Sequence, residues 1–505
     1  MITAGKVYLV GAGPGDPNLI TIKGRKVLER ADAVLYDHLA SDRLLDFAPA
    51  TAERVYVGKK RSAHEFTQDE IAQMMIERAL QGLTVVRLKG GDPFIFGRGG
   101  EEIEALAAAG VPFEIVPGVT TPLGVAAYTG VPLTHREHTS AVTFVTGHNV
   151  DAIDWNRVGA AETVVLFMGL VNIEAIAKEM IRHGRSPATP AMAVRWATRP
   201  DQETIVGTLA DLAARIRDSG MKPPVTIVIG EVVSLREKFN WFEHLPLFGQ
   251  KIVITRGSSQ SSQLAEPLEA LGAETIFAPV IEIASAADPS QLHNAIDRLP
   301  SYDWLIFTSV NGVHHFVKAL RQSQSDWRDL RAKICAIGPA TRGAVEDLLL
   351  NVDVMPAEYV AESLLDALAP FEMAGKRVLL PRAAVARDLV PQALAQRGAH
   401  VDVVEAYRTI VPLNAKERVA AALKRKPDWI TFTSSSTVKN FVELAGSPCL
   451  TGVNVASIGP VTSATARKLG VQVEVEANPY NIDGLVQAIT STDNKTEHAN
   501  LLRQT

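Results

Sequence analysis

The sequence predicts an α/β protein with several domains, and three observations carry this prediction. The chain has 505 residues, more than one hydrophobic core usually supports. Strand-like apolar runs alternate with amphipathic helix-like segments along the whole chain, a pattern typical of mostly parallel sheets covered by helices. The second half repeats itself, because DWLIFTS from Asp303, KICAIGPAT from Lys333 and KIVITRG from Lys251 return as DWITFTS from Asp428, NVASIGPVT from Asn454 and KRVLLPR from Lys376.

Composition and charge narrow the class of protein. Apolar residues make up 47% of the chain and charged residues 21%, which is ordinary for a soluble globular protein. The formal charge of −5 and the lack of Lys and Arg clusters argue against a nucleic-acid partner. No opening signal peptide and no apolar run of about 18 residues is present, so we expect a cytoplasmic location without membrane contact.

The two cysteines predict no disulfide framework. Cys335 and Cys449 lie far apart, and Cys335 sits in an apolar run, KICAIG. A small buried hydrophobe is the expected role there, in preference to a reactive thiol.

The first half begins with strand-like runs KVYLV (6–10), ADAVLYD (31–37), RVYVG (54–58), TVVRLKG (84–90) and FEIVPG (113–118). Glycine-rich turns follow the first and fourth runs, in VYLVGAGPGDPNLIT (7–21) and RLKGGDPFIFGRGGEE (87–102). Glycine lets the backbone approach a ligand closely, and Asp92 adds a carboxylate. Because parallel strands open their carboxyl ends at one edge, the two turns predict a pocket for a polar small molecule.

These motifs carry a resemblance. Together with LYDHL (35–39), VGKK (57–60), VPGVTTPLGVAAYTGVPLTHR (116–136), VTGH (145–148) and FMGL (167–170), they resemble, in the same order, the signature series of uroporphyrinogen-III C-methyltransferases, which belong to the tetrapyrrole methylases. The resemblance covers residues 5–245 and implies a two-lobed methylase fold with lobes at about 1–115 and 116–245. It also implies a homodimer formed through this half.

The resemblance implies the site residues as well. The methyl donor S-adenosylmethionine would contact Pro14, Gly90, Gly91, Asp92, Ile95, Thr120, Thr121, Met168 and Ala197. Asp37 would accept a proton and Lys59 would donate one, in transferring two methyl groups to C2 and C7 of uroporphyrinogen III to give precorrin-2. Ala197 is a departure, since the family often has glycine there.

Two other interpretations of this half are weaker. Asp37, some twenty residues beyond the first glycines, also suits the ribose-binding acid of a dinucleotide site, but Pro14 and Pro17 obstruct a phosphate cradle and the GGDPFIFGRG motif is absent from dinucleotide domains. Without the surrounding motifs, a solvent-facing ion pair would be the preferred interpretation of Asp37 and Lys59. Arg61, Arg98 and Arg136 are candidate partners for substrate carboxylates, or surface residues.

His135 and His138 have ligand-like spacing, but no cysteine or acidic cluster completes a site, so no metal is expected.

The second half resembles uroporphyrinogen-III synthase over residues 250–490, through VITRG, FTSVNGV, AIGPAT, LLPRAA, VEAYRT, FTSSSTV and SIGPVT. The resemblance implies a flavodoxin-like parallel fold at 246–490, with lobe A at about 250–285 plus 410–490 and lobe B at about 286–409. It also implies cyclisation of hydroxymethylbilane to uroporphyrinogen III, the substrate of the first half. Residues 491–505 are polar and are expected to be a disordered tail.

Hydroxyl side chains mark the ends of the repeated strands. Ser309, Thr341, Ser434 and Thr462 follow apolar strands and suit carboxylate binding, although each alone is more simply a helix cap. The resemblance implies that Tyr407 assists departure of a hydroxyl group; packing at a strand end is an equal alternative. A methylase fused to a non-catalytic, two-lobed ligand-binding module would give a similar sequence pattern.

Overall fold

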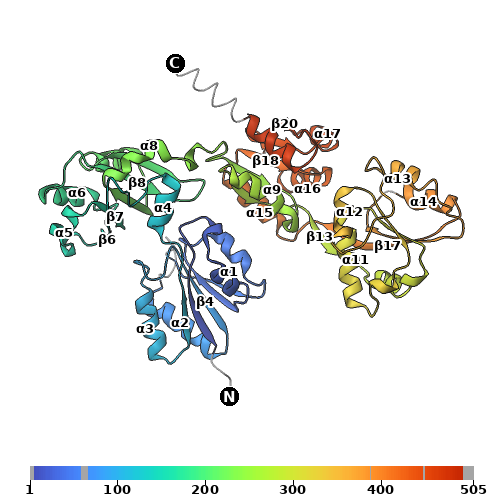
Figure 1. The fold of residues 1–505 in the computed structure, drawn as a ribbon, viewed down its shortest axis with the longest axis horizontal. Helices are drawn as coiled ribbons and strands as arrows, with labels where there is room; N and C mark the ends of the chain where they lie inside the picture. Colours follow the sequence, from blue (N-terminus) through green and yellow to red (C-terminus); the bar gives the residue numbers. More distant parts are fainter. Residues whose placement is uncertain (1–4, 59–65, 387, 447–449, 493–505) are drawn as a thin grey trace. The chain divides into compact units, whose positions relative to one another are not determined.

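The computed structural model describes residues 5–58, 66–386, 388–446 and 450–492 (Figure 1). Within these ranges the chain forms four five-stranded sheets. They are divided between two compact units, one built mainly from residues 1–250 and the other from residues 251–267 and 275–492. Each unit therefore contains two sheets, as the expected pair of two-lobed halves requires.

The first sheet has the order β3-β2-β4-β1-β5, with strands Glu53–Tyr56, Ala33–Tyr36, Thr84–Lys89, Lys6–Gly11 and Phe113–Val116. Its neighbouring strands pair in parallel. Alternate residues of β1 enter different cores: Val7 and Leu9 pack with α2 (Gln68–Leu80) and α3 (Gly99–Ala108), whereas Val10 packs with α1 (Ile22–Leu28). Helices thus cover both faces, and the carboxyl ends of β1, β4 and β5 meet at one edge.

The second sheet is mixed, unlike the first, in which all neighbouring strands are parallel. Its order is β6-β7-β10-β8-β9, with strands Val142–Thr146, Thr163–Phe167, Val225–Ile229, Pro190–Arg195 and Glu203–Thr208. Only β6 and β7 pair in parallel, and β10 lies antiparallel between β7 and β8. Strands β8 and β9 form a hairpin, whose short connection permits only antiparallel pairing.

Helices of this lobe are α4 (Thr121–Thr129), α5 (Trp155–Ala160), α6 (Ile173–Arg182), α7 (Leu212–Ser219) and α8 (Arg236–Phe239). Helix α4 joins the two lobes, because its Val125 packs into the core of the second sheet. The aromatic segment that follows α8 packs back on α4. Trp241 Nε1 donates a hydrogen bond to the Ala127 carbonyl, and Phe242 contacts the Tyr128 ring. The segment that leads to the second unit is therefore anchored on α4.

The last two sheets carry the duplication. One has the order β12-β11-β18-β19-β20 (Glu274–Phe277, Lys251–Ile254, Trp429–Phe432, Asn454–Ser457, Val475–Glu476) and the other β13-β17-β16-β14-β15 (Glu282–Ser285, His400–Ile410, Arg377–Ala383, Trp304–Phe307, Lys333–Ala336). The repeated segments occupy equivalent places: β11-β18-β19 in the first corresponds to β16-β14-β15 in the second. The two sheets differ at their edges: β13 pairs antiparallel with β17 in one, and β20 extends the other beyond β19.

Each strand of the repeat leads into an equivalent helix. Strands β14 and β15 are followed by α11 (Val310–Gln322) and α12 (Pro339–Glu346), and β18 and β19 by α16 (Ser435–Ala445) and α17 (Pro460–Lys468). The unit also contains α9 (Ser258–Ala270), α10 (Ser290–Asp297), α13 (Ala361–Ala367), α14 (Leu389–Gln396) and α15 (Ala415–Lys424). Among the described helices, none has the length and apolar character needed to cross a membrane.

Candidate active sites

Three glycine-containing loops meet where β1, β4 and β5 end. The amide of Gly91 donates to the Gly13 carbonyl at 2.7 Å, and the amide of Gly13 donates back at 3.2 Å. A Cβ on Gly11 would lie 2.5 Å from the Cα of Gly118, so the first and third loops touch through their backbones. Gly91 has φ +66°. Glycine is needed here both for this conformation and for the close approach.

Asp92 ties two of these loops together. Its Oδ1 accepts the amide hydrogen of Phe94 at 2.8 Å, and its Oδ2 accepts that of Gly118 at 3.0 Å. The carboxylate thus joins the loop after β4 to the loop after β5. Its role in this structure is to shape the site through backbone groups.

The other donor-contact candidates converge on the same edge from both lobes. A Cβ at Gly124 would lie 2.5 Å from Cγ of Pro14, so Pro14 packs on the first turn of α4, which begins at Thr121 after the N-cap Thr120. The loop after β1 also reaches the second lobe, since the amide of Asp16 donates to Thr198 Oγ1 at 2.9 Å, next to Ala197. The expected set therefore lies along one junction between the two lobes.

Aromatic contacts close this junction at two further points. The rings of Phe96 and Phe167 lie 4.8 Å apart, which brings the loop containing Ile95 to the end of β7 beside Met168. The rings of His38 and Trp196 lie 6.5 Å apart and bring Asp37 towards the end of β8 beside Ala197.

An apolar surface surrounds these loops. Phe94, Met168, Leu39 and Ile95 expose 55%, 54%, 41% and 36% of their surface. Exposed apolar side chains gathered around glycine loops are typical of a ligand site. Backbone groups plus apolar contacts fit a ligand that, like S-adenosylmethionine, has an adenosine and a sulfonium but no phosphate.

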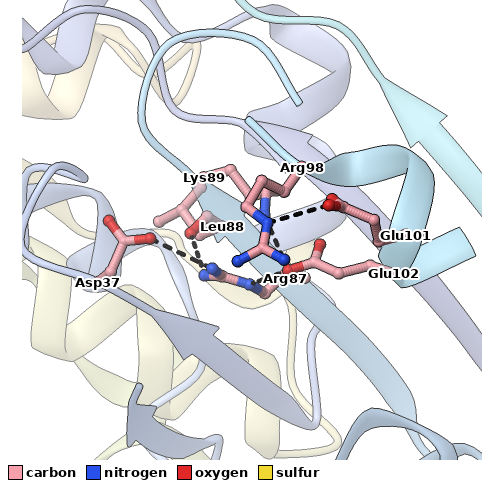
Figure 2. A network of polar contacts seen from close by, with 7 residues as sticks. All are labelled: Asp37, Arg87, Leu88, Lys89, Arg98, Glu101 and Glu102. Carbon is pink, nitrogen blue, oxygen red and sulfur yellow. Dashed lines mark hydrogen bonds and ion pairs between the residues drawn. The ribbon is translucent and has the colours of Figure 1, made fainter. Parts of the chain in front are cut away.

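Asp37 belongs to a network of charges at the end of β4 (Figure 2). Arg87 donates from Nη2 to Asp37 Oδ2 and from Nε to Glu102 Oε1, both at 3.2 Å. Lys89 Nζ donates to the same Glu102 oxygen at 2.8 Å. Arg87, Lys89 and Glu102 are at most 4% exposed, and burial, followed by the nearby Arg87 charge, lowers the pKa of Lys89. Arg87, Lys89 and Glu102 are not among the residues predicted from the sequence, although two basic residues inside an apolar strand mark the place.

The remaining candidates of this half are dispersed. Lys59 and Arg61 lie outside the described residues. Arg98 is exposed and pairs with Glu101, and Arg136 is exposed in the turn before β6. Within the described ranges, three possible metal-ligand atoms lie within 4.8 Å of one another, on His135, Glu137 and His138. The expectation that the protein holds no metal therefore stays a prediction.

In the second unit, the two serines that are candidates for carboxylate binding, Ser309 and Ser434, are both helix N-caps. Ser309 Oγ accepts the amide hydrogen of Gly312 at 3.0 Å, and Ser434 Oγ accepts that of Thr437 at 3.3 Å. Thr341 and Thr462 lie in the first turns of α12 and α17 and are each 5% exposed. Ser309 and Thr341 follow strands of one sheet, and Ser434 and Thr462 follow the equivalent strands of the other.

Tyr407 lies on β17, in the sheet that also contains β14, the strand before Ser309. Its side chain is 8% exposed and belongs to the core beneath α10 and α11. The hydroxyl is 3.0 Å from Ser309 Oγ, and the ring stacks on His315 with centroids 5.7 Å apart. Burial lowers the pKa of His315, with smaller contributions from Lys318 and His314, which favours a neutral imidazole beside the phenol.

Comparisons with known proteins agree with this division. Residues 6–213 match the family model of tetrapyrrole (corrin/porphyrin) methylases, and residues 262–487 match that of uroporphyrinogen-III synthase HemD. The porphyrin biosynthesis protein HemD of Ruminiclostridium josui is 36% identical over 492 residues, which cover 96% of this chain and 97% of that protein. The siroheme synthase of Pseudomonas fluorescens (strain Pf0-1) is 50% identical over 247 residues, but the match covers 48% of this chain and 53% of that protein.

Two solved structures from Thermus thermophilus each cover somewhat less than half of the chain. A uroporphyrin-III C-methyltransferase complexed with S-adenosylhomocysteine is 40% identical, covering 46% of this chain and all of that one, with a TM-score of 0.40. A mutant uroporphyrinogen III synthase is 20% identical, covering 49% and 99% of the two chains, with a TM-score of 0.38. On the family matches and the full-length relative, this chain is a two-part enzyme that belongs to the tetrapyrrole methylases through its first half and to the uroporphyrinogen-III synthases through its second.

Proposed function

We propose that this chain performs two consecutive steps of tetrapyrrole synthesis. The second half cyclises hydroxymethylbilane to uroporphyrinogen III, and the first half transfers two methyl groups from S-adenosylmethionine to C2 and C7, giving precorrin-2 for siroheme or cobalamin. The observation that carries the proposal is the presence of both families in one chain, because the product implied for one is the substrate implied for the other.

The first site suits methyl transfer through position. S-adenosylmethionine, when bound, supplies a methyl group on a sulfonium and leaves as a neutral thioether. The loops of Gly13, Gly91 and Gly118 would form the wall on which the donor lies, and Met168 and Ala197 would approach it from the other lobe. Holding donor and ring carbon in line supplies on the order of 7 kcal/mol or more of such a barrier.

Proton movement accompanies methylation of the ring. Asp37, with 21% of its side chain exposed, accepts the proton that the substrate loses, and Lys59 returns one. The position of Asp37 at the end of β2, beside the glycine loop after β4, supports this role.

The second site suits binding of a polycarboxylate and departure of water. Hydroxyls and helix amino termini at Ser309, Thr341, Ser434 and Thr462 bind substrate carboxylates. The Tyr407 hydroxyl protonates the hydroxyl group that leaves hydroxymethylbilane. Cyclisation then proceeds through ring inversion within a site shaped for isomer III.

The intact chain tests both steps in one experiment. With hydroxymethylbilane alone, we expect uroporphyrinogen III in excess over the spontaneously formed isomer I. With S-adenosylmethionine added, precorrin-2 should follow. Isomer I alone would assign the second half to non-catalytic ligand binding, and uroporphyrinogen III without methylation would refute the first half's role.

The proposal extends to the setting of the enzyme. We place it in the cytoplasm as a homodimer formed through the methylase half, acting on small-molecule tetrapyrroles. Light scattering of the full chain, compared with a chain cut after residue 245, tests the dimer and the half that forms it.

A further inference from the structure

The network of Figure 2 contains buried charges that the proposed chemistry does not use. Arg87 and Lys89 lie at the end of β4, and Glu102 lies in the first turn of α3. Between them runs the loop of residues 90–98, which holds several donor-contact candidates. The cluster therefore joins two carboxyl side chains, Asp37 and Glu102, to two basic ones, Arg87 and Lys89.

This cluster is poorly designed for stability alone. Removing three charged side chains from water is costly, and apolar residues of similar volume often serve a core as well or better. Glu102 binds both cations through Oε1, and among the described residues its buried Oε2 has no hydrogen-bond partner. A network left partly unsatisfied in a core points to a function other than holding the fold.

Arg87 is locked in one orientation. Besides the two carboxylates, its Nη1 donates to the Leu88 carbonyl at 3.0 Å, so three of its nitrogens are engaged. A planar fork of this kind can serve two carboxylates at once, which an ammonium group cannot do with the same geometry. Because Arg87 is held against β4 and α3, it can fix the orientation of a further group that binds its guanidinium.

The further group that Arg87 binds is the carboxylate of Asp37. The Oδ1 of Asp37 accepts the amide hydrogen of Leu39 at 3.0 Å within its own loop, and Oδ2 accepts from Arg87. With both oxygens anchored, one from β2's own loop and one from the neighbouring strand, the carboxylate cannot rotate freely. Glu102 in turn connects the same arginine to Lys89, at the base of the donor loop.

We propose that Arg87, anchored by Glu102, is a positioning residue for methyl transfer: it holds Asp37 in the orientation in which it accepts the substrate proton. The inference rests on the role proposed for Asp37. It assigns Arg87 no contact with donor or substrate.

A double-mutant cycle tests this inference. Arg87→Met, Asp37→Asn and the double variant are made in the full chain, and methyl transfer to uroporphyrinogen III is measured in single turnovers with saturating S-adenosylmethionine. Loss of orientation should lower the rate of Arg87→Met by roughly 10²-fold. Both substitutions remove the same function, proton acceptance by a correctly oriented Asp37. The double variant should therefore be no slower than Asp37→Asn alone. A double variant slowed by the product of the two single effects would overturn the inference.

Binding of S-adenosylhomocysteine separates positioning from folding. We expect Arg87→Met to retain wild-type affinity in a calorimetric titration, because its effect concerns the proton acceptor. The matched control is Arg78→Met, which removes an arginine that pairs with Glu53 in the same lobe, at 2.7 and 2.8 Å, away from Asp37. It should leave the single-turnover rate unchanged. An equal loss of rate in both arginine variants would assign Arg87 a merely structural role.

Arg87→Lys covers the case in which the methionine variant does not fold. Lysine keeps the charge but cannot bridge both carboxylates, so this variant should bind S-adenosylhomocysteine yet stay slow. Full recovery of the rate by lysine would overturn the orientation argument. A wild-type rate of methyl transfer in Asp37→Asn would refute the role proposed for Asp37. A wild-type rate in the Arg87 variants, with a slow Asp37→Asn, would refute only the positioning role of Arg87.

Discussion

The hydroxyl groups of Ser309 and Tyr407 lie 3.0 Å apart and join the N-cap of α11 to the long strand β17. Ser309 Oγ already accepts the amide hydrogen of Gly312. When its own hydrogen points to the Tyr407 oxygen, the phenol keeps its proton for a substrate, and the backbone amides at the start of α11 are left to bind a substrate carboxylate. A residue that belongs to the core can thus still serve as an acid at the edge of the sheet.

This relationship predicts the effect of deleting one hydroxyl group. Tyr407→Phe should stay folded but form uroporphyrinogen III more slowly, with isomer I accumulating. General-acid assistance is typically worth about 10²–10⁴-fold, and we expect an effect at or below the low end, because the reactive intermediate also forms unaided. Isomer-resolved chromatography measures it. Tyr302→Phe is the control, since it removes a hydroxyl in the same lobe that bonds Asp402 at 2.5 Å. An unchanged rate and isomer ratio for Tyr407→Phe would leave Tyr407 as a packing residue.

A second prediction concerns Asp92 and donor binding. Asp92→Ala frees the amides of Phe94 and Gly118 and loosens two loops of the donor site. Each hydrogen bond to a charged group is worth about 1.5–3 kcal/mol, so binding of S-adenosylhomocysteine should weaken by at least about tenfold. Calorimetric titration checks the affinity, and synthase activity of the same chain should be retained. Asp92→Asn keeps an acceptor oxygen and should lose less; wild-type affinity in Asp92→Ala would contradict the assignment.

Acid stability of the first sheet should depend on Glu114. Hydrogen bonds from Lys23 and Lys6 lower the pKa of Glu114 to about 2, and Lys6 Nζ lies 2.5 Å from its carboxylate. Because the folded pKa lies below the unfolded value of about 4.3, this stabilisation is present above that value and is lost as the pH falls towards 2. Scanning calorimetry of Glu114→Gln should show a smaller acid-induced fall in the unfolding temperature of the methylase half. The control is Glu104→Gln, on the exposed face of α3, whose unfolding temperature should fall with acid as in the wild type. The same wild-type fall in Glu114→Gln would contradict the prediction.

The last prediction concerns the thiol of Cys335. This side chain is fully buried, and burial, with a smaller contribution from Asp353, raises its pKa to about 12. In a Cys449→Ser variant, where it is the only cysteine, Cys335 should resist a thiol reagent near pH 8 until denaturant is added. Rapid labelling of the native protein would show that the strand β15 opens readily.

The sequence by itself determined those features that are encoded locally. Repeated strand-and-turn segments predicted the duplicated half, and the structure places β11, β18 and β19 in the same order as β16, β14 and β15. The glycine turns around Gly13 and Gly91 were equally readable, because only glycine suits their backbone. The family resemblance rested on the same local motifs.

The tertiary structure alone decided what depends on distant neighbours. The direction of β10 follows from its place between β7 and β8, so the mixed second sheet could not be predicted from alternation. Arg87 reaches Asp37 because β4 lies beside β2, although fifty residues separate them in sequence. Ser309 and Tyr407 meet across 98 residues because β14, which precedes Ser309, lies in the same sheet as β17, with β16 between them. Burial and pairing of a charge or a hydroxyl are properties of the assembled sheet, which no single segment contains.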